Sequence, residues 1–390
     1  MMLVHNSRGN SVPGSLSMSN ITDIQDLRHR PIPLDFPIKL PLVSVIITNY
    51  NYAKYVCAAI ESVHAQSYSP IECVIVDDSS TDDSFDVISA YLQEMADDRF
   101  RCIRLGRNLG QMGAIKAGME NASGVFVTIL DSDDLLLPDF IKEHVLAHLN
   151  GSYSAGVSAS DTLQIDHSGQ LIEATFNRFV KQRTDLPDGP LKPILPDAIN
   201  VIEPDGSIFL RQPVGTSLCY VDRSFDGWHV VGTSSLMFRR DLLELLLPDE
   251  SEAWRMCADY YLYTFAHRVS GTLTIWSQLS CFRRHRRNSF SFNPIVGGPN
   301  SPGRMPPHAR AKRDSEIARH TISRYETLSP IIGPGTCKEL IRGHSSSSRI
   351  YFGKGSERRF RLHYRLLNRL LNNKPLYSLL KPLYSLLKRR

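Results

Sequence analysis

The segment FVTILDSDDLLLPDF places three carboxylates, Asp131, Asp133 and Asp134, within four residues. An apolar run at 125–130 comes directly before them and is typical of a buried strand. Carboxylates crowded at a strand end repel one another unless a metal ion, a basic side chain or water lies among them. Hard divalent cations prefer carboxylate oxygens, and Mg²⁺ is usually held by one or two carboxylates plus substrate phosphates. A metal is therefore the natural partner of Asp131 and Asp133.

The simpler alternative for this segment is an acidic loop in front of a helix. Pro138 is expected to open that helix, because proline is tolerated at a first helical position, and Asp is favoured at the positive end of the helix dipole. This alternative explains Asp134 better than Asp131 and Asp133, which stand closest to the strand end.

A second pair of acids, Asp77 and Asp78, follows another apolar run at 71–76. One interpretation is a helix N-cap with a solvated neighbour. The other is a carboxylate that accepts hydrogen bonds from a nucleobase or a ribose. The residues alone leave both interpretations open.

Asp259 lies near the start of an apolar helical segment, MCADYYLYTF, between Cys257–Ala258 and Tyr260–Tyr261. It is either an ordinary acid near a helix N-terminus or a partly desolvated one. Desolvation raises the proton affinity of a carboxylate toward the value that a general base needs.

The segment FRRHRRN (282–288) holds four Arg, one His and one Asn. A solvated basic strand end is one interpretation. The other is a diphosphate site, because Arg makes charge-assisted hydrogen bonds to phosphate oxygens. In that case His285 is a candidate metal ligand or phosphate donor.

The elements that position these residues alternate between strand and helix four times. Short apolar runs predict strands, helical spacing of apolar residues predicts helices, and short connections between them predict a parallel sheet covered by helices. Such sheets bind ligands outside the carboxyl ends of their strands. The predicted strands are 42–48, 71–76, 101–105 and 125–130, and the predicted helices are 53–66, 82–96, 111–121 and 138–149. The polar groups at three strand ends are Thr48–Asn49–Tyr50, Asp77 to Ser80 and Asp131 to Asp134.

The pattern is weaker after residue 150. Residues 176–230 are rich in Pro, Asp and Gly, which predicts a long irregular region that shapes a second substrate site. Farther on, 232–248 reads as a strand leading into a helix, 257–269 as a helix and 273–288 as a strand with a basic end. Residues 304–390 are expected to be mostly helical and basic.

Charge and cysteine content bear on the compartment. From Lys338 to Arg390 there are 14 Lys and Arg against two acids, although the net charge of the 390 residues is only +5. Basic amphipathic segments of this kind lie on anionic membrane surfaces, and the alternative is a solvated tail that docks on the acidic body. The seven cysteines form no CxxC pair and predict reduced thiols. Without a signal-peptide core or a stretch of about 18–20 apolar residues, the chain is expected to be cytoplasmic, with a peripheral contact at the inner face of the membrane.

Taken together, three segments resemble the donor half of the family 2 glycosyltransferases, which have the GT-A fold. They are VSVIITNYNYAKYVCAAIESVHAQSYSPIECVIVDDSSTDDS, NLGQMGAIKAGMENASG and LDSDDLLLPDFI. Downstream, GTSSLMFRRDLL is similar to the acceptor-side strand of the family, CADYYL to its acidic "ED" motif and CFRRHRRNSF to its "YRxHxxNxS" segment. The resemblance covers about 41–292.

The resemblance implies a role for each matching residue. Asp259 is expected to be the catalytic base, although Ala258 replaces the usual acidic neighbour. Asp131 and Asp133 match the two acids of the DxD motif, near the ribose and at the metal respectively, and His285 helps to hold the metal and diphosphate. Thr48 and Asp78 match positions that contact the nucleotide base, and Lys116 falls where the family often has an Arg. The remaining expected donor-site residues are Tyr50, Asp77, Ser132, Arg283 and Arg286.

The sequence thus predicts a metal-dependent (Mg²⁺ or Mn²⁺), inverting glycosyltransferase with a Rossmann-like, mostly parallel central sheet. It is expected to move a sugar from a nucleotide-sugar, in particular a UDP-sugar, to a glycan or lipid-linked glycan, and no nucleic-acid partner is expected. The rival functions are transfer to a polyprenyl phosphate and non-catalytic binding of nucleotide-sugars. The predicted regions are a flexible leader (1–40), a donor half (41–150), an acceptor half (151–292) and a basic helical extension that contacts membranes (293–390).

Overall fold

The computed structural model of the protein describes residues 39–149, 153–174, 191–194, 199–202, 208–211, 218–225, 230–285, 288 and 309–342. The expectations for the leader (1–38), for Arg286 and for the basic tail (343–390) lie outside these residues. A short antiparallel hairpin, β9 (Ile199–Ile202) and β10 (Ile208–Arg211), belongs to a compact unit separate from the main one.

The first half of the main unit is the predicted series of strands and helices. Its strands lie in the order β3-β2-β1-β4, and every neighbouring pair is parallel. Strands β1 and β2 are almost wholly buried because their apolar, β-branched residues are covered on both faces. The strands are β1 (Val43–Asn49), β2 (Ile71–Asp77), β3 (Phe100–Arg104) and β4 (Phe126–Asp131), each within one residue of its predicted start. The helices are α2 (Val56–His64), α3 (Ser84–Met95), α4 (Gly110–Glu120) and α5 (Phe140–Leu149).

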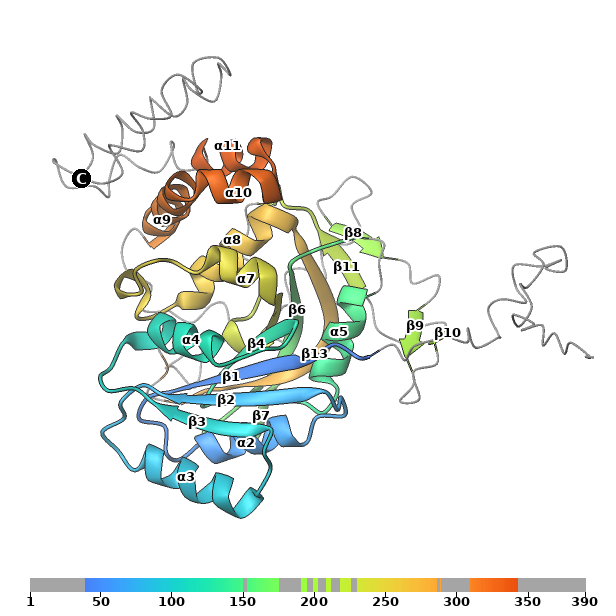
Figure 1. Ribbon diagram of the computed structural model, residues 1–390. Helices are drawn as coiled ribbons and strands as arrows, with labels where there is room; N and C mark the ends of the chain where they lie inside the picture. Colours follow the sequence, from blue (N-terminus) through green and yellow to red (C-terminus); the bar gives the residue numbers. More distant parts are fainter. Residues whose placement is uncertain are drawn as a thin grey trace, which may run out of the picture. The chain divides into compact units, whose positions relative to one another are not determined.

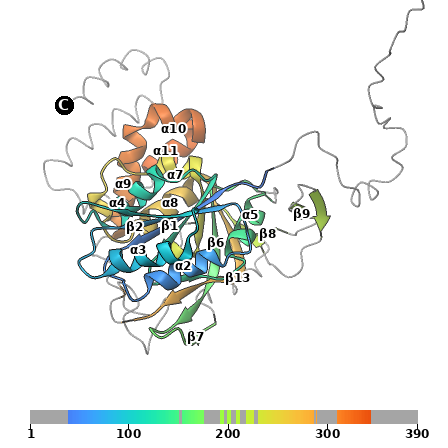
Figure 2. The ribbon, with the colours of Figure 1, turned by 60° about the horizontal axis from the view of Figure 1, so that its bottom comes forward.

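Helices cover both faces of this sheet. Helices α2 and α3 lie along one face of the first strands, and α4 lies on the opposite face (Figures 1 and 2). One predicted detail is wrong: Pro138 does not open α5, which begins at Phe140. Instead, Leu135 and Leu136 form a two-residue strand, β5, that pairs with β13, so the chain is still extended just before Pro138.

The second half of the unit extends the same sheet beyond β4. The order continues β12-β6-β13-β11-β8, and β6 and β13 are parallel whereas β12 and β11 run antiparallel to their neighbours. The predicted α/β class with a helix-covered sheet is confirmed, and its wholly parallel part is β3 to β4. These strands are β6 (Val157–Ile165), β7 (Leu171–Glu173), β8 (Leu191–Ile194), β11 (Leu218–Val221), β12 (Leu236–Arg239) and β13 (Thr272–Arg283).

The helices of the second half pack on the α4 side of the sheet. The segment 232–248, predicted as a strand leading into a helix, contains β12 and α7 (Arg240–Leu246). The helix predicted at 257–269 is α8 (Ala258–Ser270). Beyond α8 lie α9 (Ala309–Ser323), α10 (Tyr325–Ile332) and α11 (Pro334–Arg342), which fall within the region 293–390 of the predicted extension. No helix in the described part of the chain is long and apolar enough to cross a membrane. All seven cysteines are free thiols.

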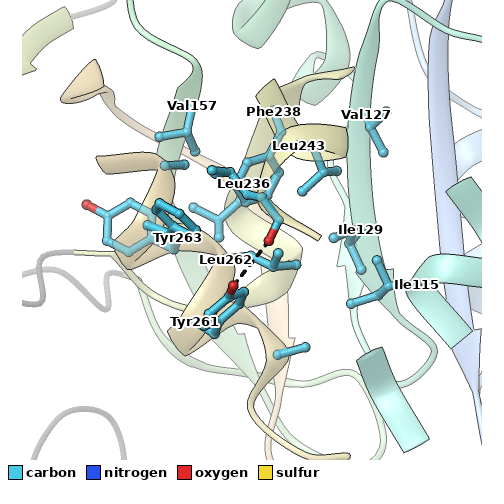
Figure 3. Close-up of a cluster of buried hydrophobic side chains, with 14 of the residues drawn as sticks. Ile115, Val127, Ile129, Val157, Leu236, Phe238, Leu243, Tyr261, Leu262 and Tyr263 are labelled. Atoms are coloured by element: carbon cyan, nitrogen blue, oxygen red, sulfur yellow. Dashed lines mark hydrogen bonds between the residues drawn. The ribbon is translucent and has the colours of Figure 1, made fainter. Parts of the chain in front are cut away.

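One apolar core joins the two halves of the sheet. In Figure 3, Ile115 of α4 and Val127 and Ile129 of β4 face Leu243 of α7 and Tyr261 of α8. The Tyr261 hydroxyl donates a hydrogen bond to the Leu246 carbonyl at 3.3 Å, which satisfies its polar group within the core. The core therefore holds α8, which carries Asp259, against β4, which leads into the acidic turn Asp131–Asp134.

Two histidines buried on α5 make a contribution to stability that is lost in mild acid, while buried carboxylates with raised pKa values act in the opposite direction. Burial lowers the pKa of His148 to about 3 and the pKa of His144 well below its usual value. The unfolded chain binds protons at these residues below about pH 6.5 and the folded chain does not, so the stability they contribute is full above that pH and is lost as pH falls. We expect a loss of about 1.4 kcal/mol per histidine at pH 5.5 relative to pH 7.5.

Urea unfolding at the two pH values measures this loss. The matched variant is His148→Phe, which keeps a ring against Phe126, whose ring centroid lies 4.8 Å from that of His148. On going from pH 7.5 to pH 5.5, the free energy of unfolding of this variant should change more favourably than that of the wild type by the contribution of one histidine. An equal change in both proteins would contradict the assignment.

Candidate active site

The polar ends of three parallel strands lie next to one another at one edge of the sheet. The β1–β4 register sets Thr48 opposite Asp131, and the β1–β2 register sets Asn49 opposite Asp77. The Asn49 amide nitrogen donates to Asp77 Oδ1 at 3.0 Å and to Ser80 Oγ at 3.2 Å. The structure thus brings together the strand ends that the sequence singled out.

Asp78 caps a helix, but not the helix that follows it in the chain. Its Oδ1 accepts a hydrogen bond from the Leu109 backbone N–H at 2.6 Å, and its Oδ2 accepts one from Gly110 N–H at 2.7 Å, at the start of α4. Burial raises the pKa of Asp78 above its ordinary value, although these two amides oppose the shift. The neighbouring Asp77 is fully buried instead of solvated, and its Oδ2 also accepts a hydrogen bond from Ser80 N–H at 3.2 Å.

The acidic turn after β4 is held by the short helix η2 (Thr233–Ser235). Ser234 Oγ accepts a hydrogen bond from Asp131 N–H at 3.1 Å and donates one to Asp134 Oδ2 at 2.7 Å. Burial raises the pKa of Asp134, with the charges of Asp133 and Asp131 adding to the shift. Asp134 is therefore a buried structural acid that fastens the turn to η2.

Asp131 is held by two side chains from other elements. Its Oδ1 accepts hydrogen bonds from Gln111 Nε2 at 3.0 Å and from Thr48 Oγ1 at 3.4 Å. Burial first, and then the charges of Asp133 and Asp259, raise the pKa of Asp131 to about 7. Asp259 lies close to η2, since its Oδ2 stands 3.9 Å from a Cβ built on Gly232, the residue before that short helix.

Asp133 contacts His285 directly. Asp133 Oδ2 lies 2.9 Å from His285 Nε2, and both side chains are largely buried. The imidazole ring stacks on Tyr55 with a centroid separation of 5.3 Å and meets Tyr52 edge-on at 5.6 Å. The structure therefore joins one predicted metal ligand of the donor half to one from the basic segment.

The third predicted ligand, Asp131, does not complete a cluster with this pair. Among the described residues no three His, Cys, Asp or Glu side chains are grouped as a metal site would require. Asp133 and His285 still offer a carboxylate oxygen and an imidazole nitrogen, and substrate phosphates commonly supply further ligands to such a metal. This donor set fits a divalent cation that binds together with a diphosphate.

Arg283 fixes the acidic turn from the other side. Its side chain is buried, and its Nε donates to the Asp133 carbonyl at 2.8 Å while its backbone N–H donates to Asp134 Oδ1 at 2.8 Å. Its guanidinium also lies over the Tyr55 ring at 4.9 Å. The structure gives Arg283 a positioning contact, and its predicted partner in phosphate binding, Arg286, is outside the described residues.

Asp259 stands in the first turn of α8. It is partly buried, and burial raises its pKa to about 6 even though backbone amides at the helix start stabilise its charged form. The residue before the helix, Cys257, has φ of 60°, a left-handed conformation that few L-residues adopt and that functional sites often hold. A carboxylate with a pKa near neutrality at this place has the property expected of a general base.

Three further predicted residues lie in quite different surroundings. The Lys116 ammonium donates to the carbonyls of Pro248 at 3.0 Å and Asp249 at 2.9 Å, so it ties α4 to the loop after α7. Tyr50 is 43% exposed at the end of β1. The Ser132 hydroxyl is buried without a hydrogen-bond partner in the described structure.

Sequence reasoning missed Gln111, Ser234 and Tyr55. Gln111 and Ser234 hydrogen-bond the acidic turn, and Tyr55 stacks on His285. Only Gln111 carried a usable signal, since a polar residue opens an otherwise apolar helix just after a strand end. The other two become visible only when distant segments are brought together.

Comparison with known proteins places this site in a family. A family model described as "Glycosyl transferase family 2" matches residues 44–201. An uncharacterized glycosyltransferase of Nostoc sp. is 34% identical over 250 residues, which cover 63% of this chain and 66% of that protein. The strand-end acids lie within the matched residues, and over these residues the chain belongs to the family 2 glycosyltransferases.

Relatives with named activities match a shorter part of the chain. The UDP-Glc:alpha-D-GlcNAc-diphosphoundecaprenol beta-1,3-glucosyltransferase of Escherichia coli is 40% identical over 106 residues, which are 27% of this chain and 41% of that enzyme. The matched part thus spans less than two thirds of the length of these relatives. Among solved structures, S. aureus TarS in complex with UDP-GlcNAc has a TM-score of 0.44 and 14% identity, over 77% of this chain and 81% of that chain.

Proposed function

We propose that the protein is a metal-dependent, inverting glycosyltransferase that moves a sugar from a UDP-sugar to a hydroxyl of a glycan or lipid-linked glycan. The observation that carries the proposal is the meeting of three groups at one edge of the sheet. These are the Asp133–His285 pair, the partly buried carboxylate of Asp131 and the carboxylate of Asp259 with a pKa near 6.

The donor half of the proposed site is 41–150. Thr48, Tyr50 and the strand end at Asp77–Asp78 stand where an open α/β sheet binds its ligand, and we assign them to the nucleoside of the donor. Because both Asp78 oxygens already accept backbone hydrogen bonds, its contact with a base would use their remaining lone pairs.

Asp133 and His285 would hold the divalent cation, with Asp131 beside the ribose. When bound, the cation neutralises charge that develops on the departing nucleoside diphosphate. The imidazole is fixed for this task because Tyr55 and Tyr52 pack on its ring. Basic side chains of the 282–288 segment would add to the same neutralisation.

Asp259 would accept the proton of the acceptor hydroxyl. That hydroxyl attacks the anomeric carbon from the face opposite the leaving diphosphate, so one displacement inverts the anomeric configuration. No second carboxylate is required as a covalent nucleophile, in contrast to retaining glycosidases. The acceptor half of the proposed site is 151–292.

The choice of donor and acceptor is supported by relatives. The E. coli relative is named for UDP-Glc and for an acceptor linked to diphosphoundecaprenol, and another relative is a succinoglycan biosynthesis protein of Rhizobium meliloti. A lipid-linked acceptor would suit an enzyme that acts on the cytoplasmic face of a membrane, with the basic segment 338–390 as its proposed contact.

Release of nucleotide by the purified protein tests the proposal. With Mn²⁺ present, UDP-, GDP- and dTDP-sugars are supplied singly, with and without a polyprenyl-diphosphate-linked sugar. We expect UDP release from at least one UDP-sugar, faster with the acceptor and abolished by EDTA. Binding of UDP-sugars without any nucleotide release would indicate a non-catalytic binding protein, and faster release with polyprenyl phosphate would indicate the rival acceptor.

A further inference from the structure

We propose that Gln111 is a positioning residue that sets the start of helix α8, and with it Asp259, at a fixed place beside Asp131. The inference deepens the proposed function, because it concerns how the proposed base meets the donor site. It rests on the hydrogen bonds of the Gln111 side chain and on the close packing of Gly110 against Arg255.

The Gln111 amide uses both of its ends, and each end reaches a different half of the site. Its Oε1 accepts a hydrogen bond from the Ala258 backbone N–H at 2.9 Å, at the first residue of α8. Its Nε2 donates to Asp131 Oδ1 at 3.0 Å and lies 3.4 Å from Thr233 Oγ1. A single side chain thus joins the acidic turn, η2 and the helix that carries Asp259.

Helix α8 needs such a partner. The first backbone N–H groups of a helix have no acceptor within the helix, and a side chain normally supplies one. Here the residue at the N-cap position, Cys257, makes no side-chain cap hydrogen bond. Gln111 caps the helix from a distant segment, one residue before Asp259.

The backbone at Gln111 has little freedom to shift. Gln111 N–H donates to the Arg255 carbonyl at 2.9 Å. The preceding residue, Gly110, has φ of 76°, and a Cβ built on it would stand 2.6 Å from the Arg255 Cα. Asp78 holds Gly110 from the other side through its 2.7 Å hydrogen bond. The side chain of Gln111 therefore starts from an anchored position and can transmit that position to α8.

The chemistry of the site explains why an amide is required. Asp131 needs a donor and Ala258 N–H needs an acceptor, and only a group with both can serve the two at once. A methionine has similar length and serves neither, which leaves a buried N–H without its partner. A glutamate keeps an acceptor for the helix start, where a carboxylate is favoured, but it sets a second charge against Asp131.

Hydrogen exchange on the full-length protein tests the cap directly. Gln111→Met should speed the exchange of backbone amides in the first turn of α8 by about fivefold or more, which corresponds to the roughly 1 kcal/mol that loss of a cap typically costs. Gln111→Glu should leave that exchange close to the wild-type rate. The matched control is Gln66→Met: Gln66 also bridges elements, donating to the Ser62 and Leu137 carbonyls and accepting from Ile141 N–H, but away from the acids. It should leave α8 unchanged.

Steady-state kinetics test the consequence for catalysis. We expect both Gln111 variants to lower kcat by about 10- to 100-fold while the KM for the UDP-sugar and the Kd for UDP change less than about threefold. The control variant should retain wild-type kcat. Loss of donor affinity that matches the loss of kcat would instead make Gln111 a substrate-binding residue and overturn the proposal.

The two measurements separate failure of this inference from failure of the proposed function. Unchanged exchange at the start of α8 in Gln111→Met overturns the inference whether or not the protein is active. If the wild type releases no nucleotide from any donor, the proposed function fails, and the exchange comparison still decides whether Gln111 holds the start of α8.

Discussion

Replacing Asp259 with Asn is expected to lower kcat for sugar transfer by about 10²- to 10⁴-fold, the usual contribution of a general base. The amide keeps the size and the helix-start position of the side chain but cannot accept the proton of an acceptor hydroxyl. Affinity for UDP should stay within a few-fold, because the role of Asp259 lies in the chemical step. Initial rates and calorimetric binding of UDP measure the two quantities.

The pH dependence adds a second signature of the base. With the pKa of Asp259 raised to about 6, wild-type kcat should rise with pH through that value and level off above it, since only the deprotonated form accepts a proton. This rise of kcat with pH should be absent in Asp259→Asn. The matched control is Asp86→Asn, which removes an exposed acid from the first turn of α3 and should retain wild-type rates. If UDP affinity falls as far as kcat, Asp259 belongs to donor binding or to the fold.

Replacing Asp133 with Asn is expected to lower turnover by about 10²- to 10³-fold and to raise the Mn²⁺ concentration needed for half-maximal rate. A neutral amide is a weaker ligand for a hard cation than a carboxylate, yet its oxygen can still accept a hydrogen bond from His285. The fold should therefore survive, and thermal unfolding of the variant would verify that. Rates are measured across a Mn²⁺ titration.

The exposed acid Asp139 supplies the control for this experiment. Asp139 follows the same turn. Its carboxylate accepts a hydrogen bond from Ser67 Oγ at 2.6 Å instead of contacting His285. Asp139→Asn should show the wild-type Mn²⁺ dependence. Near-normal turnover of Asp133→Asn, together with a rate that EDTA does not change, would remove the metal from the mechanism.

The sequence predicted the first half of the fold well because its strands are buried on both faces. Runs such as Val43–Ile47 can form little else than a central strand, and their polar ends then mark the ligand edge. Strand β6 was missed for the opposite reason. Within Val157–Ile165, apolar residues are interspersed with Ser, Thr and Gln residues that are also buried. The segment therefore shows neither the continuous apolar run of a buried strand nor the alternation of a strand with one face in solvent.

The residue types of the site could be predicted from the sequence, but the contacts between these residues could not. Strand ends located the acidic turn, and the resemblance located Asp259 and His285. Which helix Asp78 caps, however, depends on α4 returning to the end of β2, and no local pattern encodes that return. The same holds for Lys116, whose ammonium binds the carbonyls of Pro248 and Asp249, more than 130 residues away in sequence.

The shared core also limits how parts can be exchanged between relatives. Ile115 and Ile129 of the first half of the main unit pack in one cluster with Leu243 and Tyr261 of the second half, and β12 is hydrogen-bonded between β4 and β6. A fragment cut near residue 150 would expose that surface and an open sheet edge, both of which favour aggregation. A chimera that aims to change acceptor choice should therefore keep β12, α7 and α8 from the parent of the donor half and graft only the loops around them.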